Sequence, residues 1–118
     1  MDKLISMLAG LGVAGLVLVV VISTTGLVGG AAFVAALAAL GPGGIAGGLI
    51  SLGVIALVAK ALSEYGFEAL FTGVARELYL KGETRESIMK KIVMWPISKN
   101  IKLKVENELK KLEDRAEK

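Results

Sequence analysis

Residues 4–59 read LISMLAGLGVAGLVLVVVISTTGLVGGAAFVAALAALGPGGIAGGLISLGVIALVA, a run of 56 residues without Asp, Glu, Lys or Arg. Only Asp2 and Lys3 of the 25 charged residues precede this run, and the other 23 follow it. A helix at the surface of a soluble domain carries polar residues on its outer face, and this run has no such face. The sequence therefore predicts an integral membrane protein.

The run divides into three apolar pieces, Leu4–Ile22, Leu27–Leu40 and Ile45–Ala59. A membrane crossing takes about 20 apolar residues, so the run is long enough for two or three crossings. The middle piece spans only about 21 Å as a helix, which allows a tilted crossing, a re-entrant helix or a continuation of the first helix. The first piece is longer than the apolar region of a signal peptide, so we expect the chain to retain it.

Residues 60–118 predict a charged helical region in water. Thirteen of the 14 basic residues lie there, which places this region in the cytoplasm by the positive-inside rule. Apolar residues recur there at steps of three and four: Leu62, Phe67, Leu70, Phe71, Val74, Leu78, Ile88, Met89, Ile92, Val93, Ile101, Val105, Leu109 and Leu112.

Local signals divide this region into helices. Gly82 predicts a helix stop, and Thr84 predicts the N-cap of a helix from Arg85 to about Met94. A last helix is expected from Lys99 to about Arg115, although the alternation in residues 101–105 also allows a strand. The fold class is thus an all-α integral membrane protein, with two to three Gly/Ala-rich transmembrane or re-entrant helices in residues 1–59 and a small amphipathic helical cytoplasmic region in residues 60–118.

Small residues at four-residue spacing are the main functional signal, because they let membrane helices pack closely. Such a pattern occurs in each apolar piece, and one chain needs fewer faces than that to pack on itself. Self-association is therefore one interpretation, and packing within a single chain is the other. The predicted helix-packing residues are Gly10, Ala14, Ala31, Ala35, Ala39, Gly43, Gly44, Gly47, Gly48 and Ser51.

Charged residues beyond the apolar run suggest two further sites. Glu64 and Glu68 follow the predicted membrane exit and would form acidic rings at a pore mouth in an oligomer; a solvated helix face is the simpler interpretation. The segment from Arg85 to Lys111 has eight basic and three acidic residues. Anionic lipid attracts such a segment, and no motif favours nucleic acid. The predicted lipid-headgroup contacts are Lys90, Lys91, Trp95, Lys99 and Lys102.

The residue types do not support catalysis. The chain has no Cys and no His, and residues 4–59 contain no ionisable side chain. A serine in that run has no neighbouring base to activate it, and an ion-coupled transporter normally needs a charged group in the membrane. We therefore expect no enzyme activity, no metal site and no cofactor.

In layout, with two or three Gly/Ala-rich spans followed by a charged tail, the chain resembles small holin-type and toxin-type membrane proteins. The small-residue faces, the absence of catalytic groups and the position of Glu64 and Glu68 predict a self-associating membrane protein that forms an oligomeric pore, channel or permeabilising assembly. Its expected partners are membrane lipid and further copies of itself. The alternative is a membrane anchor or accessory subunit whose residues 60–118 dock a protein partner. An inserted antibacterial toxin is a third and weaker interpretation.

Overall fold

The computed structural model describes residues 2–25, 52–94 and 99–117, and this part of the chain is entirely helical. The helices are α1 (Asp2–Gly10), α2 (Val13–Thr25), α5 (Leu52–Tyr65), α6 (Phe67–Leu80), α7 (Arg85–Val93) and α8 (Lys99–Glu117). The prediction of an all-helical chain is confirmed for these residues, and residues 101–105 belong to α8 rather than to a strand.

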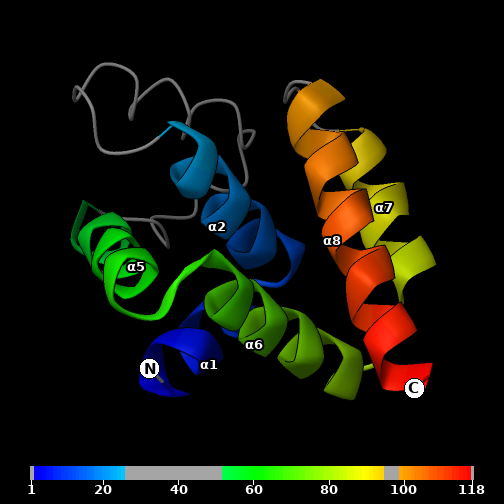
Figure 1. Cartoon of the computed structure of the whole chain (residues 1–118), viewed down its shortest axis with the longest axis horizontal. Coiled ribbons are helices and arrows are strands. Elements are labelled where there is room, and N and C mark those ends of the chain that lie inside the picture. Colours follow the sequence, from blue (N-terminus) through cyan, green and yellow to red (C-terminus); the bar gives the residue numbers. More distant parts are fainter. Residues whose placement is uncertain (1, 26–51, 95–98, 118) are drawn as a thin grey trace.

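Helix α2 lies at the centre of the described helices and contacts α1, α5, α6, α7 and α8. Figure 1 shows α5 on one side of α2, the paired helices α7 and α8 on the other, and α6 beside α1. The apolar rows predicted for the C-terminal region face this centre, with Leu70, Val74 and Leu78 on α6 and Val105 and Leu109 on α8 almost fully buried. Residues on both sides of the charge boundary at Lys60 therefore share one hydrophobic core.

The prediction of one helix over Leu4–Ile22 is wrong, because the chain turns at Leu11 and Gly12, with a bend of 118° between α1 and α2. Gly12 has φ 72, a left-handed conformation that a residue with a side chain adopts only at a cost. Leu8 and Ala9 accept hydrogen bonds from Leu11 N and Gly12 N, at 3.0 and 2.9 Å, and so close the turn. The apolar row from Leu62 to Leu78 is likewise divided between two helices, because the chain breaks at Gly66 between α5 and α6.

The predicted helix stop and the predicted N-cap between α6 and α7 are both confirmed. Gly82 has φ 101, its N–H donates to the Tyr79 carbonyl, and the N–H of Glu83 donates to the Leu78 carbonyl, which is the Schellman pattern of a helix C-terminus. Thr84 then caps α7 reciprocally with Ser87: each backbone N–H donates to the other's hydroxyl, at 2.8 and 3.1 Å. These contacts fix the reversal that brings α7 and α8 back along α2.

Candidate functional site

The most unusual element of the structure is α2, because it is apolar on every face. Seven consecutive residues, Leu16 to Ile22, are no more than 4% exposed. An ordinary surface helix has one apolar stripe and one polar face, whereas a helix that is apolar all round belongs in the middle of a protein or in lipid. Here the surrounding helices take that role and bury α2.

The polar side chains near the end of α2 are satisfied within the helix. The Ser23 hydroxyl donates to the Val20 carbonyl at 2.8 Å, and the Thr24 hydroxyl donates to the Val21 carbonyl at 3.0 Å. Because these hydroxyls need no partner outside the helix, α2 carries no unmet polar requirement into an apolar environment at these positions.

The corner before α2 depends on two glycines. Gly12 supplies the left-handed backbone of the turn, and Gly15 lies where α2 crosses the backbone of α1. A Cβ on Gly15 would overlap the carbonyl of Leu8, and backbone atoms have little room to move aside. Both glycines are therefore required by the bent arrangement and not by α2 as a helix.

None of the described helices has by itself the length and hydropathy of a membrane span. Helix α1 and residues 13–24 of α2 together have the length and hydropathy of a membrane span, although a bend of 118° separates them. This match concerns length and composition alone.

The sequence-predicted packing residues lie elsewhere. Gly10 faces open space, with no atom within 4 Å of the position that a Cβ would occupy, and Ala14 is half-buried. Gly15, which makes the close approach, was missed because the four-residue spacing directed attention to its neighbour Ala14. The other predicted packing residues lie outside the described part of the chain: Ala31, Ala35, Ala39, Gly43, Gly44, Gly47, Gly48 and Ser51.

Glu64 and Glu68 are separated by the break at Gly66 and lie on different helices. Glu64 is 3.9 Å from Lys60 on α5, whereas Glu68 on α6 pairs with Arg115 of α8 at 3.4 Å. All four side chains are largely exposed, and such pairs contribute about 1 kcal/mol or less. The two glutamates thus do not form one acidic row in this arrangement.

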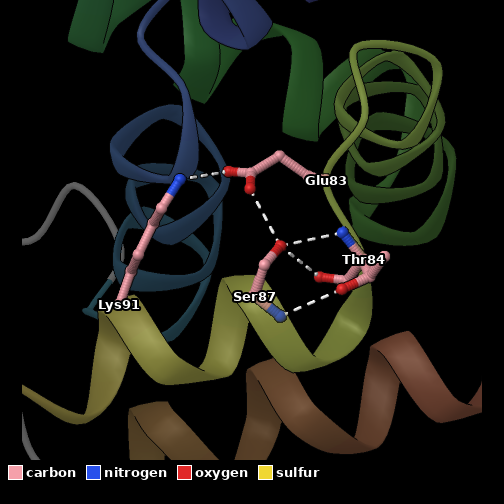
Figure 2. Close-up of polar contacts among 4 residues, drawn as sticks. All are labelled: Glu83, Thr84, Ser87 and Lys91. Carbon is pink, nitrogen blue, oxygen red and sulfur yellow. Dashed lines mark hydrogen bonds and ion pairs between the residues drawn. The ribbon is translucent and has the colours of Figure 1, made fainter.

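The predicted headgroup lysines differ in their contacts. Lys91 is held by Glu83 at 2.7 Å, and Ser87 also donates to that carboxylate, as Figure 2 shows. These two hydrogen bonds lower the pKa of Glu83. Lys102 donates to the Val93 carbonyl at 3.0 Å, which ties α8 to the C-terminal end of α7. Lys90 and Lys99 are exposed and have no hydrogen-bond or ion-pair partner in the described part of the chain, and Trp95 lies outside it.

A cavity of about 500 Å³ lies where the end of α6 meets the start of α7 and the end of α8. Its lining includes Arg76, Tyr79 and Leu112, together with the ion pair between Arg85 and Glu113 at 3.4 Å. The Tyr79 hydroxyl is buried without a hydrogen-bond partner, and burial, followed by the nearby Glu113 carboxylate, raises the pKa of Tyr79. The lining has equal numbers of arginines and glutamates, so the cavity favours no ligand charge.

No cluster of three or more His, Cys, Asp or Glu side chains suited to a metal ion occurs within residues 2–25, 52–94 and 99–117. Comparison with known proteins found no matching family model, no similar curated protein and no similar solved structure. Function is therefore inferred from the chain's own residues.

Proposed function

We propose that this chain is a small self-associating membrane protein that forms an oligomeric pore, channel or membrane-permeabilising assembly. The main support is α2, a helix that is apolar on all sides and lies within a run of 56 residues without a charge. Lipid chains and apolar side chains are comparable surroundings for such a helix. The apolar contacts of Leu16–Ile22 can therefore be exchanged for contacts with lipid.

The corner between α1 and α2 gives this exchange a physical route. If the turn at Leu11 and Gly12 became helical, residues 4–25 would form one helix about 33 Å long, which matches an apolar bilayer thickness of about 30 Å. The charged residues Asp2 and Lys3 would then remain at the membrane surface. In this proposal the bent pair is the compact form, and the straight helix is the membrane form.

Few polar contacts oppose the opening. The pair between Arg115 and Glu68 joins α8 to α6, and the pair between Arg85 and Glu113 joins α7 to α8. Both pairs are partly or largely exposed, so each contributes about 1 kcal/mol or less. Apolar packing holds α2 in place, and a bilayer offers the same apolar surroundings. Small residues at four-residue spacing in residues 31–51 then supply the contacts between copies. The pore lining is small and apolar, so the pore conducts when water fills it.

The test is the mass of the full-length protein in detergent, with the detergent contribution subtracted, followed by ion conductance in planar bilayers. We expect a defined oligomer of several copies that passes ions. A monomer that passes no ions would contradict the pore, and would favour a membrane anchor whose residues 60–118 dock a partner.

A further inference from the structure

Charge is strongly polarised along the antiparallel pair of α7 and α8. Residues 87–105 contain five lysines and no acidic residue, whereas residues 106–117 contain five acidic and three basic residues. The basic end is where the C-terminus of α7 meets the N-terminus of α8, and Lys102 donates to the Val93 carbonyl across this junction. We call this end the hairpin tip and define it as Lys90, Val93, Met94, Lys99, Lys102 and Leu103.

Large apolar side chains protrude at the same tip. Met94 is 86% exposed, Val93 is 63% exposed and Leu103 is 46% exposed. The periodicity places Val93 on the apolar stripe of α7, but in the structure Ile88 and Ile92 fill the core and Val93 points out of it. The hairpin tip therefore presents apolar side chains and lysines together, in a region without a carboxylate.

We propose that the hairpin tip docks on an anionic lipid bilayer, with Lys90 and Lys99 at the phosphate headgroups and Met94 and Val93 among the upper acyl chains. Lysines near a membrane draw anionic lipid, and protruding apolar side chains gain by leaving water at the same surface. Nucleic acid would use the lysines but would leave Met94 and Val93 in water. The inference rests on the proposed membrane function and names the class of lipid it needs.

Docking at the tip would also bring the uncharged run to the membrane. Figure 1 shows the C-terminal end of α2 and the start of α8 on the same, upper side of the view. Helix α2 contacts both α7 and α8, so the three helices belong to one packed unit. A bilayer held by the tip therefore lies on the side of the molecule at which α2 ends.

The test uses the single tryptophan, Trp95, which directly follows Met94 in the sequence. Full-length protein is mixed with vesicles of phosphatidylcholine that carries bromine on its acyl chains, with or without added phosphatidylglycerol, and quenching of Trp95 emission is recorded. We expect quenching to require the phosphatidylglycerol and to weaken as salt is raised. Equal quenching by brominated phosphatidylcholine alone, or a stronger emission response to duplex DNA than to the anionic vesicles, would overturn the proposal.

Matched variants locate the effect. Two double variants change the formal net charge equally, from +3 to −1: Lys90→Glu with Lys99→Glu, and Lys110→Glu with Lys111→Glu. The first pair should raise the lipid concentration for half-maximal quenching about 30-fold or more, and the second pair should change it far less. Met94→Ser should weaken quenching several-fold, while Leu80→Ser, at a residue that is 81% exposed on α6, should not. Equal effects within either comparison would overturn the docking site.

Release of a trapped dye from the same vesicles separates this inference from the proposed function. If the tip variants weaken quenching but the wild type releases no dye, the result supports docking and contradicts the pore. If dye is released but the tip variants quench as the wild type does, the result supports the pore and overturns the docking site.

Discussion

Substitution of the corner glycines tests the opening of α1 and α2 directly. Gly12→Ala places a side chain in a left-handed conformation, which destabilises the bent form by about 1–2 kcal/mol. Gly15→Ala forces a Cβ against the backbone of Leu8, and overpacking of this kind typically destabilises by about 1–3 kcal/mol. Neither effect exists in a straight helix, where both alanines are favoured over glycine.

Gly10→Ala is the matched control. Gly10 is helical and a Cβ there would have nothing within 4 Å, so alanine stabilises the bent form and the straight form alike. A shift of about 1.4 kcal/mol changes an equilibrium tenfold. We therefore expect Gly12→Ala and Gly15→Ala to move the population toward the membrane form by about tenfold, and Gly10→Ala to leave it nearly unchanged.

The assay follows one cysteine, because the natural chain contains none. Met7→Cys introduces a thiol at a residue that is 39% exposed in the bent form. In a straight helix over residues 4–25 the same position lies about 4.5 Å inside the span. A maleimide that does not cross membranes should label this cysteine in lipid-free protein and label it less after vesicles are added, with the largest loss of labelling in the Gly12→Ala and Gly15→Ala backgrounds.

Thermal unfolding of the lipid-free variants, followed by far-UV circular dichroism, supplies the second measurement. Gly12→Ala and Gly15→Ala should lower the midpoint, and Gly10→Ala should hold or raise it. If all three variants unfold and label alike, the corner does not separate two forms of the chain and the reasoning is refuted.

Three further predictions concern the helices that cover α2. Leu109→Ala on the buried face of α8 should destabilise the compact form by about 2–5 kcal/mol, while Leu103→Ala on its outer side should change the denaturant midpoint little. The pKa of Glu83 lies below its ordinary value of 4.5 in the folded chain. The ionised carboxylate therefore stabilises the fold above pH 4.5, and this stabilisation is lost as the pH falls through the lowered pKa. Glu83→Gln should remove this contribution to the loss of stability in acid, as measured by thermal melts. Tyr79→Phe removes a buried hydroxyl without a partner, so it should not lower the thermal midpoint at pH 7. Because burial raises the pKa of Tyr79 above 10.0, the wild type, but not this variant, should lose stability as the pH rises beyond that value.

Much of the C-terminal fold follows from local rules. The stop at Gly82 and the cap at Thr84 depend on a few adjacent residues, and each is formed as the sequence predicts. The buried row of Val105, Leu109 and Leu112 follows from helical spacing. The turn at Gly12 could not be found in this way, because it lies inside an apolar run with no Pro and no polar residue beside it. A glycine there is compatible with a continuous helix, and only the packing of α1 on α2 and α6 selects the turn.

The same reasoning explains why α2 supports a functional proposal. Hydropathy predicts that Leu16–Ile22 avoid water, and the structure satisfies this with five neighbouring helices. Those neighbours carry exposed ion pairs on their outer sides and apolar side chains toward α2, so they separate α2 from water. A bilayer can replace them in that role, provided that the corner opens and that something brings the molecule to the lipid surface. Gly12 and Gly15 govern the first requirement, and the lysines and apolar side chains of the hairpin tip meet the second. Under the proposed function, the compact bundle and the membrane form are two ways to keep Leu16–Ile22 out of water, and substitutions that act on only one form should change the balance between the two.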